Sequence, residues 1–259
     1  MMKKVLLFTV VIFLSLAFQA PDKKVRIFIA GDSTAQTYKE KDGLIRGWGQ
    51  MLHKFLTDDV KVVNHAMGGR SSKTFIEEGR WDRLLSEVQS GDYVIIQFGH
   101  NDASTRPERH ASHKDYYKNL TKFVNDVRSK NANPILATSI VMRTFKDRVL
   151  VDDRLKAYPA ITRMAARDLS VPLIDANVAS RDLVLLLGDE PSKPYYRWVE
   201  PGIDPVKPDG IEDDTHMLEL GATQMASFIA EEISRQDLEN LSEYVIADQF
   251  LKFNIGFEK

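Results

Sequence analysis

Short apolar runs alternate along the chain with longer stretches of helical periodicity. Valine and isoleucine dominate the short runs, as is typical of buried strands, and these runs are Val25–Ala30, Val60–Asn64, Tyr93–Gln97, Pro134–Ile140 and Pro172–Ile174. Apolar positions in the longer stretches recur at helical spacing, and clear examples are Trp48–Leu56, Tyr116–Lys130 and Val151–Asp168. The pattern therefore predicts strands and helices in alternation.

Nearly continuous apolar strands separated by helices indicate a parallel sheet that is buried on both faces and joined by right-handed crossovers. We therefore expect a three-layer α/β/α domain. Ligands of such sheets bind outside the carboxyl ends of the strands. The polar residues directly after each strand are thus the candidates for chemistry.

Residues 1–20 have the pattern of a secretory signal peptide. Two lysines precede the apolar run Val5–Leu14, as in signal sequences, and cleavage is expected near Ala20. Residues 21–259 would then form a single domain, since α/β domains often reach about 250 residues. A membrane anchor is the alternative, but the run is shorter than the ~20 apolar residues that a spanning helix needs.

The charge balance and the cysteine content narrow the partners and the location. The chain has 35 Lys and Arg against 37 Asp and Glu, a formal net charge of −2, and loss of the two leading lysines makes the mature chain about −4. We therefore expect neither nucleic acid nor an anionic membrane as a partner. Without cysteine there is no disulfide, thiolate metal site or cysteine nucleophile. A disulfide-free exported protein with a large core suits a bacterial periplasm or the cell exterior.

Glycine and polar residues follow three of the predicted strands directly. Gly31–Ser33 follows the first, where the glycine permits a sharp turn before a helix that Ser33 would begin. The second strand leads to Gly68–Arg70 and the third to Gly99–Asp102. Helix capping or turn formation explains each motif taken alone. Polar groups clustered at the end of a buried strand cost free energy, however, unless they are satisfied or used.

A fourth polar block precedes the last predicted helix, Gly221–Ile233. Asp213 stands three residues before His216, so on one turn its carboxylate can accept from one imidazole nitrogen and aim the other at a nucleophile. Asp214 is the competing carboxylate, although its spacing fits less well. A lone histidine is usually structural. Here the Asp213–His216 pair occurs together with Ser33 and the polar strand-end loops, and this combination favours a serine hydrolase.

These four blocks, in this order, resemble those of the SGNH, or GDSL-type, hydrolases, which have a flavodoxin-like five-stranded parallel sheet. Within that family the sequence is most similar to the rhamnogalacturonan acetylesterases of carbohydrate esterase family 12. The similarity is dense from Gly31 to Asp102 and returns at the last block. The motifs that carry it are Gly31–Thr34, Gly47–Gly49, Val62–Asn64, Gly69–Ser71, Glu78–Arg80, Gly91–Val94 and Asp213–His216.

The resemblance implies a catalytic set and no cofactor. Ser33 would be the nucleophile, His216 the general base and Asp213 the carboxylate that orients it. The oxyanion hole would consist of the Ser33 N–H, the Gly69 N–H and the Asn101 side chain. Chemistry agrees, because a serine hydroxyl is a weak nucleophile until a base takes its proton, and imidazole accepts one near neutral pH.

The resemblance also implies the substrate, an acetylated polysaccharide or oligosaccharide, with rhamnogalacturonan expected and the enzyme acting as a secreted monomer. Arg70, Arg46 and Arg143 lie near strand ends or glycine loops, where a guanidinium can bind a uronate carboxylate. A solvated surface role is the equal alternative for each. Trp198 lies in the proline-rich stretch Glu190–Asp209, whose aromatic side chains either stack on sugar rings or cap the core.

Other hypotheses stay open. A lipid or thioester hydrolase uses the same triad but needs an apolar acyl channel, and a carbohydrate-binding protein with a dead site has no use for an intact catalytic set. A metal site is a further alternative, because four possible ligands are close together in the sequence: His100, Asp102, His110 and His113. They do not form a complete ligand set, which a metal site needs. The segment after Gln236 is expected to add a helix and a tail that pack on the domain.

Overall fold

The computed structural model describes residues 24–151, 154–155, 157–238 and 240–250. One sheet contains strands β1 (Val25–Gly31), β2 (Val60–Asn64), β3 (Tyr93–Gln97), β4 (Asn133–Ala137) and β7 (Leu173–Ile174), in the order β2-β1-β3-β4-β7. All of its pairings are parallel, and this order is the flavodoxin-like one. The predicted α/β fold with a five-stranded parallel sheet is confirmed.

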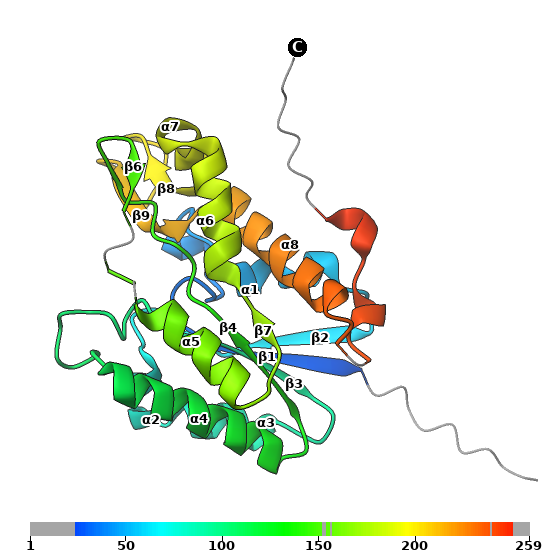
Figure 1. Cartoon of the computed structure of the whole chain (residues 1–259). Helices are drawn as coiled ribbons and strands as arrows, with labels where there is room; N and C mark the ends of the chain where they lie inside the picture. The colour runs from blue at the N-terminus through cyan, green and yellow to red at the C-terminus, as the bar shows by residue number, and fades with distance from the viewer. Residues whose placement is uncertain (1–23, 152–153, 156, 239, 251–259) are drawn as a thin grey trace, which may run out of the picture.

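Helices cover both faces of the sheet (Figure 1). One face is covered by α2 (Ser72–Glu77), α3 (Arg80–Glu87), α4 (His113–Ser129) and α5 (Ala157–Asp168), and the other by α1 (Trp48–Met51), α6 (Ala176–Leu187) and α8 (Glu219–Arg235). Successive side chains of a strand point to opposite faces. In β1, accordingly, Phe28 packs in the cluster that contains Trp81, whereas Ile27 and Ile29 pack in the cluster that contains Trp48. Strand alternation thus divides the apolar side chains between two cores.

Serine hydroxyls cap α2 and α4, the helices that follow β2 and β3. The Ser71 hydroxyl accepts the Thr74 N–H at the start of α2 at 3.2 Å, and the Ser112 hydroxyl accepts the Asp115 N–H at the start of α4 at 3.1 Å. Each such cap satisfies one of the N–H groups that the first helical turn leaves open. Ser71 thereby fixes where the loop after β2 ends.

The predicted strand Pro134–Ile140 is too long, because β4 ends at Ala137. Residues 138–140 remain buried, but their carbonyl groups bond to side chains. The Asn177 amide donates to the Ser139 carbonyl at 3.1 Å, and a ring nitrogen of His100 lies 2.9 Å from the Ile140 carbonyl. Burial continues past the end of the strand, so the apolar pattern did not mark that end.

Two antiparallel ribbons that the sequence did not predict lie outside the sheet. They are β5 (Phe145–Lys146) with β6 (Val149–Leu150), and β8 (Tyr196–Val199) with β9 (Ile211–Met217). β8 follows the short helix α7 (Asp189–Ser192) and lies within the proline-rich stretch Glu190–Asp209. Its Tyr196 is 1% exposed and donates to the Val141 carbonyl at 3.0 Å, so this aromatic side chain caps the core.

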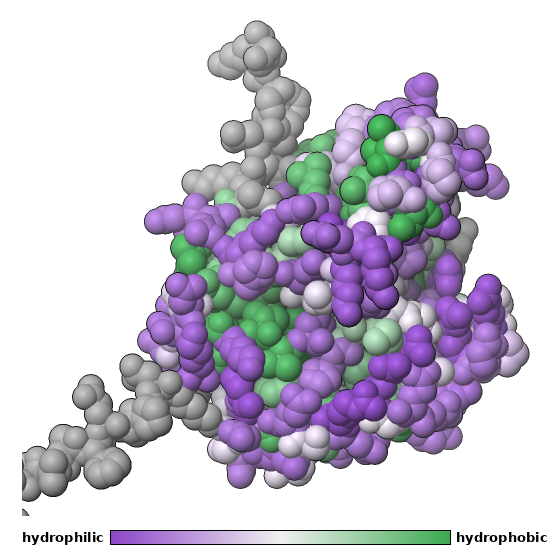
Figure 2. Space-filling view, turned by 180° about the vertical axis from the view of Figure 1, so that it is seen from behind, coloured by the Kyte–Doolittle hydropathy of each residue, from purple (hydrophilic) through white to green (hydrophobic). Residues whose placement is uncertain are grey.

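Of the segment after Gln236, residues 240–250 pack back onto the domain and contain two 3₁₀ turns, Ser242–Tyr244 and Ala247–Gln249, whereas residues 251–259 lie outside the described residues. Val245 pairs with Leu56, and Leu241 is fully buried. The predicted signal peptide lies outside the described residues. Within the described ranges no helix has the length and apolar character needed to cross a bilayer. Seen from behind, the surface is mostly hydrophilic, with its hydrophobic residues in separate patches (Figure 2).

Candidate active site

Ser33 and His216, 183 residues apart in the chain, meet through their side chains. His216 Nε2 lies 2.9 Å from Ser33 Oγ, and His216 Nδ1 lies 2.7 Å from Asp213 Oδ2. Asp213 Oδ1 accepts the N–H groups of Thr215 at 2.8 Å and of His216 at 3.0 Å. When Nδ1–H donates to the carboxylate, Nε2 is left to accept the serine proton. This is the arrangement by which a Ser-His-Asp triad activates a hydroxyl.

A bulge in β9 creates this closeness. Asp213 pairs with Arg197 and Met217 pairs with Tyr196, so the residues between Asp213 and Met217 have no counterpart in β8. In a regular strand, side chains three positions apart point to opposite faces. The prediction that Asp213 and His216 share an ordinary turn is therefore corrected, since they lie in a strand whose bulge brings them together, as bulges near active sites do.

The environment of Asp213 favours its ionised form. Burial by itself raises the pKa of this carboxyl, but the hydrogen bond and charge of the His216 ring and the N–H groups of His216 and Thr215 outweigh it. The pKa of Asp213 is consequently lowered to about 2. Near neutral pH the carboxylate thus accepts from His216 Nδ1–H and stabilises an imidazolium when one forms.

Ser33 lies in a single turn, and the prediction that it begins a helix is wrong. The Ala35 N–H closes the turn on the Asp32 carbonyl at 3.3 Å, and the Thr34 carbonyl accepts instead from Trp48 at 2.9 Å. The next α-helix therefore starts only at Trp48. Asp32 Oδ1 accepts the Thr34 N–H at 2.9 Å and the Thr34 hydroxyl at 2.8 Å, so the Asp32 side chain stabilises the turn.

The glycine loop after β2 passes beside the serine. A Cβ atom on Gly68 would lie 3.5 Å from Ser33 Cβ, and Gly69 has a φ of +78°, which favours glycine. Asn101 Nδ2 donates to the Arg70 carbonyl at 3.0 Å, so the loop after β3 joins the same cluster. In the described part of the chain, the N–H groups of Ser33 and Gly69 donate to no protein acceptor. Both remain available to a ligand.

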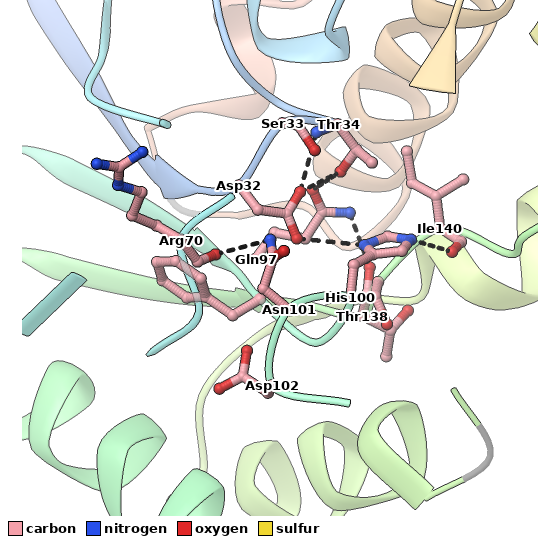
Figure 3. A network of polar contacts seen from close by, with 12 residues as sticks. Asp32, Ser33, Thr34, Arg70, Gln97, His100, Asn101, Asp102, Thr138 and Ile140 are labelled. Carbon is pink, nitrogen blue, oxygen red and sulfur yellow. Dashed lines mark hydrogen bonds and ion pairs between the residues drawn. The ribbon is translucent and has the colours of Figure 1, made fainter. Parts of the chain in front are cut away.

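A buried polar network lies under the serine turn (Figure 3). Asp32 Oδ2 lies 3.2 Å from His100 Nδ1, and His100 Nε2 lies 2.9 Å from the Ile140 carbonyl. Both ring nitrogens face acceptors, and only the imidazolium form donates to both. Burial raises the pKa of Asp32, but the charge and hydrogen bond of His100 and the two bonds from Thr34 lower it overall. His100 thereby holds the turn that carries Ser33.

The Asp102 side chain points away from that network (Figure 3). Its carboxylate accepts the Ser72 N–H at 3.0 Å and the Ser72 hydroxyl at 2.5 Å. Burial raises the pKa of Asp102 to about 7, and the Ser72 hydrogen bonds offset only part of that rise. Because Ser72 begins α2, Asp102 connects the loop after β3 to the helix that follows the glycine loop.

Arg143 and Trp198 pack against each other on the β8–β9 ribbon. Arg143 is 2% exposed, its guanidinium binds the carboxylates of Asp189 at 2.6 Å and Asp214 at 3.0 Å, and it lies 4.6 Å from the Trp198 ring. The substrate contact predicted for Arg143 is therefore corrected, because its charge is buried and paired. Trp198 Nε1 also donates to Asp214 at 2.8 Å. Asp214 is thus held by Arg143 and Trp198. The carboxylate that contacts His216 is that of Asp213.

The other two predicted arginines are more accessible. The Arg70 side chain is 33% exposed and pairs with Glu78 at 3.0 Å. Arg46 is half-buried, its side chain donates to the Gly43 carbonyl at 2.8 Å, and its N–H donates to the Met217 carbonyl at 2.9 Å. Arg70 therefore adjoins Gly69, and Arg46 adjoins the end of β9 that carries His216.

Three residues of this region were missed by the sequence reasoning. The Tyr38 hydroxyl donates to the Ser33 carbonyl at 2.9 Å, and burial together with nearby Asp32 raises its pKa well above the ordinary value. The buried Gln97 accepts from Trp48 Nε1 at 2.6 Å. Arg109 donates to Asn101 Oδ1 at 2.9 Å. Only the closeness of Arg109 to the Asn101 motif in the sequence was a usable signal.

The histidines of the metal hypothesis do not converge. His100 is engaged as described above, whereas His113 begins α4 with its ring edge-on to Tyr158 at 5.3 Å. Among the residues that the structure describes, no group of three or more His, Asp or Glu side chains is arranged to hold a metal ion.

The fold and the site define a class, and the chain belongs to the GDSL-like lipase/acylhydrolase family, whose profile matches residues 29–222. Rhamnogalacturonan acetylesterase RhgT of Bacillus subtilis (strain 168) is 37% identical over 216 residues, which cover 83% of this chain and 92% of RhgT. YesY of the same strain, named a probable rhamnogalacturonan acetylesterase, is 35% identical over 225 residues, which cover 86% of this chain and 98% of YesY.

Solved structures agree with this assignment. The crystal structure of YxiM from Bacillus subtilis superimposes with a TM-score of 0.70 at 27% identity, covering 83% of this chain and 57% of that chain. The predicted resemblance to GDSL-type hydrolases is confirmed, and the protein is a carboxylic ester hydrolase.

Proposed function

We propose that the protein is an exported serine esterase that removes acetyl groups from plant cell-wall polysaccharide, with rhamnogalacturonan as the main substrate. The observation that carries this proposal is the continuous chain of contacts from Ser33 Oγ through His216 to Asp213, at 2.9 and 2.7 Å. The acetyl group and the carbohydrate are supported by the name of RhgT. Export is supported by the signal-peptide pattern of residues 1–20.

In the acylation step, Ser33 Oγ attacks the carbonyl carbon of the acetyl ester while His216 Nε2 takes the hydroxyl proton. The carbonyl oxygen becomes an oxyanion, and the proposed donors to it are the N–H groups of Ser33 and Gly69 and the second N–H of Asn101 Nδ2. Collapse of the intermediate breaks the bond to the sugar oxygen, which leaves with the proton from His216. Ser33 now carries the acetyl group.

In the deacylation step, water attacks the acetyl carbonyl of Ser33 and His216 takes the proton of that water. The same donors stabilise the second oxyanion. Breakdown returns the proton from His216 to Ser33 Oγ and releases acetate. Asp213 stays ionised in both steps, which agrees with its pKa of about 2.

For the substrate, we propose that the partly exposed Arg70 contacts a uronate carboxylate of the polysaccharide, with Arg46, whose main chain pairs with Met217, as a second contact. Arg70 directly follows Gly69, so a carboxylate bound there lies close to the reacting ester. Trp198 is a weaker candidate. It neighbours Arg197, the partner of Asp213, so it points to the other face of the ribbon.

Acetate release tests the substrate proposal. Purified protein lacking residues 1–20 is incubated with acetylated rhamnogalacturonan, acetylated homogalacturonan and acetylated xylan, and with nitrophenyl esters of two-carbon and twelve-carbon acids. We expect the fastest acetate release from rhamnogalacturonan and a preference for the short ester. Faster hydrolysis of the long ester would instead favour a lipid or thioester hydrolase, and faster release from xylan would move the substrate to another polysaccharide.

A further inference from the structure

Arg109 holds the amide that is proposed for the oxyanion hole. Its guanidinium donates to Asn101 Oδ1 at 2.9 Å, and it reaches that atom from the loop between β3 and α4. We propose that Arg109 is a positioning residue that fixes the orientation of the Asn101 amide and polarises it. This inference rests on the proposed function, because it assumes that Asn101 donates to the oxyanion.

Two neighbours determine which way the amide faces. A guanidinium only donates and a carbonyl oxygen only accepts. Arg109 therefore requires the oxygen of the Asn101 amide on its side, and the Arg70 carbonyl, 3.0 Å from Nδ2, requires the nitrogen on the other. An amide nitrogen carries two hydrogens. The Arg70 carbonyl uses one of them, and the second remains for the substrate in a fixed orientation.

The charge of Arg109 acts on this amide without a competing carboxylate. Arg70 pairs with Glu78, whereas Arg109 forms no ion pair with any carboxylate in the described part of the chain. Asn101 is 6% exposed, so water screens the interaction only in part. Hydrogen bonds with an ionised partner are roughly twice as strong as neutral ones, and bonds in a chain polarise one another. Withdrawal of charge toward Oδ1 makes the remaining N–H a stronger donor.

The effect is expected in turnover rather than in binding. The substrate carbonyl carries only a partial negative charge, whereas the tetrahedral intermediate carries a full one. A polarised donor thus stabilises the transition state more than the ground state, and such differential stabilisation raises kcat. If Arg109 served only to bind a uronate, its loss would raise KM for acidic substrates and leave a small neutral ester unaffected.

Steady-state kinetics on 4-nitrophenyl acetate, which carries no carboxylate, separate these roles. The variants are R109A, R109Q, which keeps a donor without charge, and R109K, which keeps the charge. R106A is the matched control, because Arg106 lies on the same loop, is exposed, and its side chain forms no hydrogen bond or ion pair with the described residues. N101A and the double variant N101A/R109A complete a cycle that measures coupling between the two side chains. Thermal unfolding of each variant reports whether it remains folded.

We expect kcat of R109A and R109Q to fall roughly tenfold with KM unchanged, and R109K to stay within about threefold of wild type, because charge-assisted hydrogen bonds are the stronger ones. R106A should match wild type, and the double variant should be no slower than N101A. A wild-type kcat in R109A would overturn the role of Arg109, and so would a double variant whose loss of kcat equals the product of the two single losses. Neither result would affect the proposed function. A wild-type protein that hydrolyses no acetyl ester would instead overturn the proposed function.

Discussion

Replacing Asp213 by asparagine keeps the shape of the side chain but exchanges one carboxylate oxygen for an NH₂ group. The remaining oxygen stays with the two N–H groups that Asp213 Oδ1 accepts, at 2.8 and 3.0 Å. The NH₂ group then faces His216 Nδ1 and donates to it, which requires the tautomer with its proton on Nε2. That proton points at Ser33 Oγ, 2.9 Å away. The base is lost although the geometry is preserved.

The loss expected for D213N is large. A wrong histidine tautomer lowers kcat by about 10⁴-fold in serine proteases, which corresponds to about 5 kcal/mol of transition-state stabilisation. Stability should change as well. The pKa of Asp213 falls from its ordinary 3.8 to about 2, and at about 1.4 kcal/mol per pKa unit its ionised form contributes roughly 2 kcal/mol. That contribution is present above pH 4 and disappears as the pH falls through 2.

The assays are hydrolysis of nitrophenyl acetate at pH 7 and urea unfolding from pH 7 down to pH 2, the range over which the contribution of Asp213 is lost. D214N is the matched control, because Asp214 is the adjacent carboxylate but is held by Arg143 and Trp198. We expect D214N to keep a kcat close to that of wild type. If D214N lost activity as severely as D213N, or if D213N kept its activity, the assignment of the carboxylate would be refuted.

Three further predictions test other parts of the site. N101A should lower kcat by about 100-fold or more while the protein stays folded, since one oxyanion donor contributes on the order of 3 kcal/mol; an unchanged kcat would remove Asn101 from the oxyanion hole. D102N should gain stability relative to wild type as the pH rises from 4 to 7. The Asp102 carboxyl ionises near 3.8 in the unfolded chain and only near 7 in the folded one, so the wild type loses about 1.4 kcal/mol of stability per pH unit in this range. Thermal unfolding measures the difference, and melting temperatures of the two proteins that change equally with pH would contradict it. R70A should raise KM for acetylated rhamnogalacturonan without affecting nitrophenyl acetate, and equal effects on both would point to a role in the loop itself.

The sheet was predictable because its central strands are buried on both faces. The central strands are nearly continuous apolar runs, and Tyr93–Gln97, for example, was predicted with the bounds that the structure shows. The strand-end loops followed from the same logic, since carboxyl ends of parallel strands gather at one edge. Ser33 and Asn101 were therefore placed near each other before any geometry was known.

The remaining features depend on contacts that no local pattern records. The bulge that joins Asp213 to His216 exists only because β9 pairs with β8, and both strands are short and partly polar. The burial of Arg143 follows from its pairing with Asp189 and Asp214, two carboxylates that are far away in the sequence. Arg109 is likewise recognisable only once its guanidinium is seen against the Asn101 amide.

The central claim is that Ser33 is the nucleophile, and covalent labelling tests it most directly. An alkyl fluorophosphonate, which reacts with serines that a neighbouring base activates, is added to wild type, S33A and D213N, and intact masses and peptide maps are recorded. The account predicts a single adduct on Ser33 in wild type, none in S33A and far slower labelling in D213N. An adduct on another residue, or an S33A variant that still releases acetate at the wild-type rate, would contradict it.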